Sequence, residues 1–124
     1  MKNLSNASQM SLAVYRFRLL LQAAEVLLMN VGFVYMLCND GKNVLYTGST
    51  GDLKSRINHH KRRYIPGFTK KYNVDRLVYF ERFASVEEAK YREKQIKGYS
   101  RAKKEALIVL ENPIWSELSC EHLD

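Results

Sequence analysis

The chain has 124 residues, of which 46% are apolar, and a formal net charge of +7 at neutral pH. This length and apolar content suit one compact soluble domain and argue against a second large domain. The two cysteines, Cys38 and Cys120, have no neighbouring thiol and no metal-ligand spacing. They exclude a disulfide framework and indicate a reducing compartment.

The positive charge is concentrated in one part of the chain. Residues 41–104 hold 17 Lys and Arg against 6 Asp and Glu, a net +11, whereas residues 105–124 hold five acids and no Lys or Arg. A basic segment of this size attracts polyanions, nucleic acid first, and such binding weakens as salt is added. A solvated surface that serves only solubility is the alternative, and charge alone does not separate the two.

Residues 1–30 are predicted to be an extension that starts disordered and continues as an amphipathic helix. Apolar side chains recur at helical spacing at Leu12, Tyr15, Leu19, Ala23 and Val26. Gln22 and Glu25 interrupt the apolar stretch and leave only short apolar runs, so we expect no membrane partner and a cytoplasmic protein. A weak membrane or signal segment is the alternative.

Two strands are predicted over residues 32–39 and 44–48, on either side of the turn at Asp40-Gly41. Asp and Gly tolerate the positive φ angles of tight turns, so this pattern is typical of a β-hairpin. The hairpin places Tyr35 and Tyr46 on neighbouring antiparallel strands.

A helix is predicted next, from the N-cap Asp52 to about residue 63. Its spacing places Arg56 and His60 on one stripe. Pro66-Gly67 then breaks the chain, and residues 76–83 read as a third strand.

Two further helices complete the expected fold. Ser85 and Glu88 form a capping-box pattern that opens a helix through residue 97, and Ser100 caps a last helix that stops before Asn112-Pro113. The order β-β-α-β-α-α predicts an α+β fold, with a small three-stranded antiparallel sheet flanked by helices and an added N-terminal helix.

Five features follow one another along the chain: the segment FVYML, the segment LYTGST, Arg56 ten residues after Tyr46, Glu93 within YREKQIKG, and ENPIW near the end. Together they resemble the GIY-YIG nuclease family, and most of all its small single-domain bacterial members. The resemblance covers about residues 31–118 and leaves an acidic tail at 119–124. The segments 33–35 and 46–48 replace the two tripeptides of the family name, and both tyrosines and the second glycine are kept.

The resemblance implies a DNA endonuclease that hydrolyses phosphodiester bonds with one divalent cation, Mg²⁺ or Mn²⁺, and needs no small-molecule cofactor. Arg56 suits the phosphate, because its planar fork stays charged and binds two oxygens at once. Glu93 is implied as the metal ligand, and an exposed i, i+4 pair with Lys97 is its alternative role. Tyr35 and Tyr46 are implied as catalytic, either as a general base or as hydrogen-bonding groups that orient the attacking water.

Two more residues join the site by the same resemblance. His60 matches a family position near the attacked phosphate and could relay a proton or donate a hydrogen bond to that phosphate. Asn112 matches an asparagine that helps to order the site, and stopping a helix before a proline is an equally good explanation.

Several basic side chains follow the expected site and are predicted to contact the DNA backbone with little sequence preference. They are Lys54, Lys61, Arg62, Arg63, Lys70 and Lys71.

Two positions depart from what some relatives carry. Ser49 stands where some have lysine, and Thr69 stands where some homing endonucleases have a second histidine. The departures predict a slow site, or one that uses Lys70 or Lys71 instead. We expect an endonuclease of DNA repair, recombination or defence; the alternatives are a non-catalytic nucleic-acid-binding module of the same fold, and an interaction protein whose leading helix docks on a partner.

Overall fold

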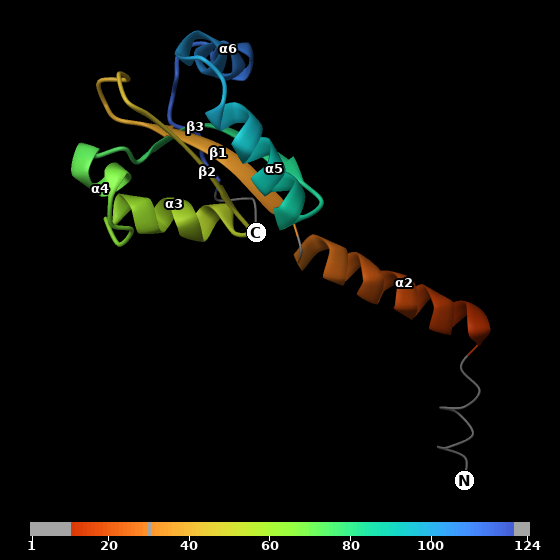
Figure 1. Ribbon diagram of the computed structural model, residues 1–124. Coiled ribbons are helices and arrows are strands. Elements are labelled where there is room, and N and C mark those ends of the chain that lie inside the picture. The colour runs from red at the N-terminus through yellow and green to blue at the C-terminus, as the bar shows by residue number, and fades with distance from the viewer. Residues whose placement is uncertain (1–10, 30, 121–124) are drawn as a thin grey trace. The chain divides into compact units, whose positions relative to one another are not determined.

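The computed structural model describes residues 11–29 and 31–120, and the chain falls into two compact units, residues 1–30 and 31–124 (Figure 1). The predicted disorder of the first residues, and the last four residues of the acidic tail, lie outside the described residues. Each unit is therefore considered by itself.

The first unit contains helix α2 (Leu12–Met29). Its side chains from residue 12 to residue 24 are exposed, among them the large apolar groups of Leu12, Phe17 and Leu20. None of the helices in the described ranges combines the length and the hydropathy that crossing a bilayer requires.

The second unit is built on a sheet of β1 (Gly32–Cys38), β2 (Leu45–Thr50) and β3 (Arg76–Phe83). Its strand order is β2-β1-β3 and both pairings are antiparallel. The predicted α+β fold with a three-stranded antiparallel sheet is confirmed.

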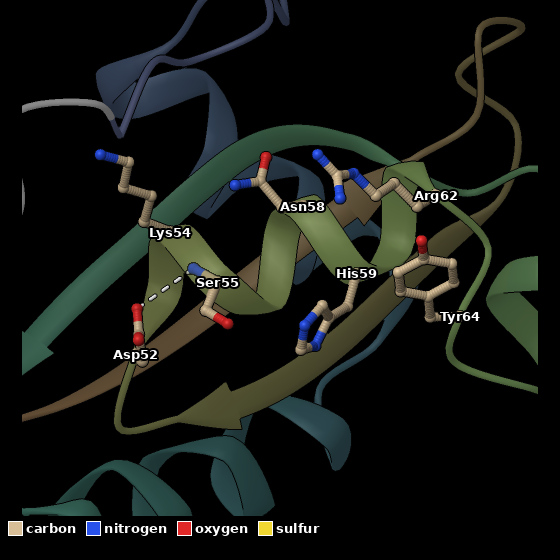
Figure 2. Close-up of a pocket in the computed structure, with 7 residues that line it drawn as sticks. All are labelled: Asp52, Lys54, Ser55, Asn58, His59, Arg62 and Tyr64. Atoms are coloured by element: carbon tan, nitrogen blue, oxygen red, sulfur yellow. Dashed lines mark hydrogen bonds between the residues drawn. The ribbon is translucent and has the colours of Figure 1, made fainter.

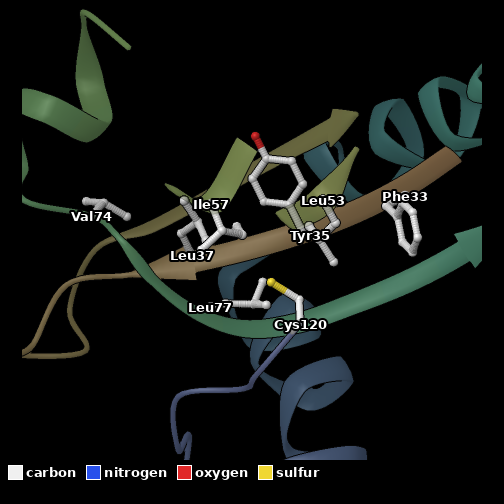
Figure 3. Close-up of a cluster of buried hydrophobic side chains, with 8 residues drawn as sticks. All are labelled: Phe33, Tyr35, Leu37, Leu53, Ile57, Val74, Leu77 and Cys120. Atoms are coloured by element: carbon white, nitrogen blue, oxygen red, sulfur yellow. The ribbon is translucent and has the colours of Figure 1, made fainter. Parts of the chain in front are cut away.

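Strand β1 is buried on both faces, because it lies in the middle of the sheet with helices on either side (Figure 1). Alternate side chains point to opposite faces. Phe33, Tyr35 and Leu37 pack on the face that α3 covers, and we call this the tyrosine face (Figure 3). The opposite face packs against α5 and α6, and we call it the apolar face.

Within residues 31–120 of the second unit, four helices accompany the sheet: α3 (Leu53–Lys61), α4 (Phe68–Tyr72), α5 (Val86–Lys97) and α6 (Arg101–Glu111). The predicted N-caps are present, since the side chains of Asp52, Ser85 and Ser100 each accept a bond from a backbone N–H three residues later.

The prediction made from the sequence differs from the structure at two points, the end of α3 and the presence of α4. Helix α3 ends at Lys61 rather than near residue 63, because Arg63 takes a left-handed φ of 60° that no helix continues through. The five-residue helix α4 was not predicted at all, and it is short enough to escape a periodicity test.

Candidate active site

The two tyrosines come together on the tyrosine face. In the β1–β2 register Tyr35 pairs with Gly48 and Leu37 pairs with Tyr46, so the two rings lie on the same side, 6.2 Å apart between centroids. Tyr35 is completely buried, whereas Tyr46 is half-buried. Of the two phenols, Tyr46 is therefore the one that solvent can reach.

Gly48 explains how the Tyr35 hydroxyl fits at this position. A Cβ atom on residue 48 would lie 2.6 Å from Tyr35 Oη and 3.0 Å from Tyr46 Cε1. The phenol passes directly over the backbone of β2, and only a residue without a side chain leaves it room.

His60 connects the tyrosines to the end of α3. Its Nε2 lies 3.1 Å from Tyr35 Oη and its Nδ1 lies 3.0 Å from Thr69 Oγ1. The imidazole ring also meets the ring of Tyr46 edge-on, with centroids 5.6 Å apart. Tyr35, Tyr46 and His60 thus form one packed cluster, and Thr69 extends its hydrogen bonds to α4.

Burial controls the protonation of this cluster. Burial is the largest cause that raises the pKa of Tyr35 above its ordinary value, and Tyr46 adds to the rise while Arg56 opposes it. For His60, burial and then the nearby Arg56 and His59 lower the pKa to about 4. At neutral pH Tyr35 is a neutral phenol and His60 is a neutral imidazole.

Arg56 lies one helical turn before His60 on α3 and is half-buried. Its charge lowers the pKa of both Tyr35 and His60, so the guanidinium acts on both groups. The structure therefore brings together four residues that the sequence singled out, Tyr35, Tyr46, Arg56 and His60.

Glu93 approaches β2 from the other face of the sheet. Its Oε1 accepts a hydrogen bond from the Ser49 hydroxyl, and its Oε2 lies 2.6 Å from Lys97 Nζ. Partial burial opposes ionisation, but the hydrogen bonds from Lys97 and Ser49 outweigh it and hold the pKa of the Glu93 carboxyl below its ordinary value. Glu93 is thus an ionised carboxylate whose two oxygens both have partners.

The relation of Glu93 to the tyrosines follows from the alternation of β2. Gly48 pairs with Tyr35, whereas Ser49 pairs with Val34 of the apolar face. The carboxylate is therefore one residue further along β2 than the tyrosine cluster and on the opposite side. Because β2 is at the edge of the sheet, both sides of the strand adjoin the same free edge.

Asn112 is buried at the end of α6, where it makes structural contacts. Its amide Nδ2 donates to the backbone oxygens of Val78 (3.0 Å) and Ser116 (2.8 Å), and its Oδ1 accepts from the N–H of Ser116 at 3.0 Å. These bonds tie the end of α6 to β3. They match the helix-ending role that the sequence left open beside a role in the site.

The basic side chains predicted to contact DNA lie on α3, on α4 and between them. Lys54 and Arg62 line a hollow of about 330 Å³ along α3, together with Asn58, His59 and Tyr64 (Figure 2).

The other basic side chains of the set are exposed. They are Lys61, Arg63, Lys70 and Lys71. Lys61 pairs with Glu117, so its ammonium is already partly neutralised. Lys71 lies over the ring of Tyr72, with Nζ 5.3 Å from the ring centroid.

Ser49 and Thr69 are the two site contacts whose role the sequence did not reveal. They were noted only because other residue types occupy these positions in some relatives, yet Ser49 binds Glu93 and Thr69 binds His60. Their positions in the family pattern could have identified them, because a residue of another type at a site position still lies beside the same neighbours.

Comparison with known proteins supplies the remaining finding. Residues 31–106 match the model of the GIY-YIG catalytic domain. UPF0213 proteins of Staphylococcus aureus, among them those of strains Mu50 and N315, are 41% identical over 81 residues, which is 64% of this chain and 96% of theirs. The solution structure of a UPF0213 protein from Bacillus halodurans is 32% identical with a TM-score of 0.46, covering 73% of this chain and 96% of that one.

Proposed function

Because the chain belongs to the GIY-YIG family, whose domain is a catalytic domain of nuclease type, we propose that it is a divalent-metal-dependent endonuclease that hydrolyses DNA phosphodiester bonds. The observation that carries the proposal is the packed cluster of Tyr35, Tyr46 and His60 beside Arg56, at an edge strand that also binds Glu93. Hydrolysis of a phosphodiester needs an oriented water, positive charge on the phosphate oxygens and stabilisation of the leaving oxygen.

Tyr46 is proposed to face the attacking water. It is the more exposed phenol, whereas Tyr35 is completely buried and bonded to His60. The rings of Tyr35 and His60 pack against the ring of Tyr46 and hold it in place. The Tyr46 oxygen would accept a hydrogen bond from the water and so orient it for attack on the phosphorus.

Arg56 is proposed to bind the attacked phosphate. It is half-buried next to the tyrosines, so its charge acts in a partly desolvated place where electrostatic attraction is stronger than in water. Its planar fork can hold two phosphate oxygens at once, which lysine cannot.

Glu93 and Ser49 fit a hard divalent cation, because both present oxygen atoms and the carboxylate is ionised. Lys97 now satisfies Glu93 Oε2, but its side chain is 54% exposed and is free to turn into solvent. A bound Mg²⁺ or Mn²⁺ would supply positive charge for the phosphate and the leaving oxygen. Glu93 would hold the ion from the apolar-face side of β2, across the strand from the tyrosines.

The basic side chains of α3, of α4 and of the segment between them are proposed to hold the DNA backbone beside the site. Backbone contacts position a duplex and carry no sequence information, so we expect little sequence preference and a steep salt dependence. Repair, recombination or defence in the cytoplasm is the setting in which we propose that the enzyme acts.

A non-catalytic nucleic-acid-binding module is the second candidate. The pairing of both Glu93 oxygens, with Ser49 and with Lys97, favours it, because a carboxylate that keeps these partners is closed to a metal ion.

A plasmid-nicking assay with Mg²⁺, and with EDTA in parallel, separates the two candidates. Removal of one preorganised charge donor costs about 10²–10³-fold in rate, so Arg56→Ala should lose at least that much and Arg56→Lys should not restore it. Glu93→Ala should abolish the metal-dependent product. Arg82→Ala is the control: it removes the same charge from an exposed position of β3, the strand at the opposite edge of the sheet from β2, and should cleave like wild type.

DNA binding without any metal-dependent product in the wild-type chain would reject the nuclease and leave the binding module. Equal rates for Arg56→Ala and Arg82→Ala would reject the role given to Arg56.

A further inference from the structure

Three polar side chains from three different elements form a chain of hydrogen bonds inside the second unit. Thr69 on α4, His60 on α3 and Tyr35 on β1 are linked by contacts of 3.0 and 3.1 Å, in that order. Each of the three residues is 5% exposed or less. The three groups are therefore shielded from bulk solvent, and each depends on its neighbour for a hydrogen bond.

The chemistry of the three groups gives the direction of these bonds. A neutral imidazole has one N–H donor and one acceptor nitrogen. A phenol is more acidic than an aliphatic alcohol, so Tyr35 is the stronger donor and suits the acceptor nitrogen, Nε2. The remaining Nδ1–H then donates to Thr69 Oγ1, which has two lone pairs. The lowered pKa of His60, about 4, agrees with a neutral ring.

The backbone around α4 fixes the place of the Thr69 hydroxyl. Thr69 is the buried residue of this helix, which follows Gly67 at a φ of 101° and ends at Tyr72, with Asn73 capping it in the left-handed conformation. The N–H of Val74 donates to Thr69 O at 2.9 Å, and Val74 is part of the buried cluster of the tyrosine face. Glycine is the residue that tolerates such a φ, so the turn at Gly67 and the anchor at Val74 together aim Thr69 at His60.

We propose that Thr69 is a positioning residue that acts through His60: it holds the imidazole in the Nδ1–H tautomer, so that Nε2 accepts the hydrogen bond of the Tyr35 hydroxyl. Its consequence for catalysis rests on the proposed nuclease function. With its own hydrogen committed to His60, the Tyr35 oxygen is open to accept from the Tyr46 hydroxyl. Tyr46 then presents its lone pairs, rather than its hydrogen, to the attacking water.

The tautomer can be measured directly on the full chain without DNA or metal, by ¹⁵N–¹H correlation spectra of the histidine rings at pH 7. The His60 signals are assigned by their loss in His60→Gln. Wild type should show a protonated Nδ1 and an unprotonated Nε2. Thr69→Val removes the hydroxyl and should shift the ring to the Nε2–H form, whereas Thr69→Ser keeps the hydroxyl and should preserve the wild-type spectrum.

Thr50→Val is the matched control. Thr50 is also buried, but its hydroxyl bonds to the backbone of Asp52 and not to His60, so the His60 tautomer should not change. A wild-type spectrum with the proton on Nε2, or a Thr69→Val spectrum identical to wild type, overturns the proposal. Should Thr69→Val fail to fold, the wild-type and Thr69→Ser spectra still decide, because a His60 proton on Nε2 in either one contradicts it.

Rates of DNA cleavage by the same variants test the consequence for catalysis. Orienting hydrogen bonds behind metal-bound histidines are worth about 10–100-fold, and by analogy we expect Thr69→Val to lower kcat by about that factor with KM for DNA unchanged. Thr69→Ser should restore kcat. An inactive wild-type chain would reject the nuclease function but leave the tautomer result standing, so the two failures are distinguishable.

Discussion

The two faces of the sheet are built from the same strand and serve different ends. On the apolar face, β1 contributes Val34, Met36 and Cys38, which pack against α5 and α6. On the tyrosine face, alternate residues of the same strand place a phenol against an imidazole. The comparison teaches that burial stabilises one face by removing hydrocarbon from water, and on the other it sets which groups carry protons.

The polar groups of the tyrosine face are tolerated because they satisfy one another. A buried polar group without a partner costs about 1–3 kcal/mol. Tyr35, His60 and Thr69 each have a partner, and no buried side-chain nitrogen or oxygen in the described residues lacks one. The tyrosine face thus gives up part of its hydrophobic stabilisation and keeps a polar network in a defined geometry.

The largest effect is expected from the apolar face. Ile108 of α6 is completely buried there, so Ile108→Ala should lower the free energy of unfolding by about 2–5 kcal/mol through lost burial and the cavity it leaves. Urea unfolding measures the loss. Leu110→Ala on the same helix, at a side chain that is 81% exposed, should change stability by less than about 0.5 kcal/mol. Equal losses for the two variants would contradict the packing described for α6.

The tyrosine face should respond to pH. The pKa of His60 is lowered from 6.5 to about 4 in the folded chain, so the unfolded chain binds more protons between these values. The stability that depends on a neutral His60 is therefore present above pH 6.5 and lost as pH falls to about 4, a decrease of about 3 kcal/mol. Urea unfolding between pH 7 and pH 4 should show a smaller decrease for His60→Gln than for wild type.

His59→Gln is the control for this pH dependence, because His59 is exposed at the adjacent position. It should change the wild-type slope much less than His60→Gln does, because burial, the largest cause of the low pKa of His60, remains when His59 is replaced. If His60→Gln and His59→Gln fall equally with pH, burial does not set the protonation of His60.

A smaller effect is expected where β2 meets the tyrosines. Gly48→Ala would place a Cβ 2.6 Å from Tyr35 Oη, and forcing the phenol aside should cost about 1–3 kcal/mol and disturb its bond to His60. Thermal unfolding and the His60 spectrum measure the two consequences. Gly98→Ala, whose Cβ would meet its nearest atom at 3.4 Å, should leave both unchanged. A Gly48→Ala chain as stable as wild type, with an unchanged His60 spectrum, would show that Tyr35 is not confined over β2.

Most of the fold could be read from local patterns. The hairpin of β1 and β2 and the caps at Asp52, Ser85 and Ser100 depend on neighbours within a few residues, and the structure confirms them. The left-handed residue between the two strands is Lys42, with a φ of 58°, rather than Asp40 or Gly41. Helix α4 escaped because five residues are too few for a helical period.

The site was predictable only as a set of residue types. The resemblance to the GIY-YIG family marked Tyr35, Tyr46, Arg56 and His60 as candidates, and the fold brings them together. The sequence did not show that Glu93 reaches β2 from the opposite face, because that depends on which side of the sheet α5 covers.

What the sequence determined by itself is the order of the elements, their caps and the side chains available for chemistry, because these follow from local spacing and composition. What only the tertiary structure decided is how those side chains are paired: Tyr35 with His60, His60 with Thr69, and Glu93 with Ser49. The partners in these bonds are between 9 and 44 residues apart. Their meeting, and the burial that sets their protonation, arise when the helices pack on the sheet.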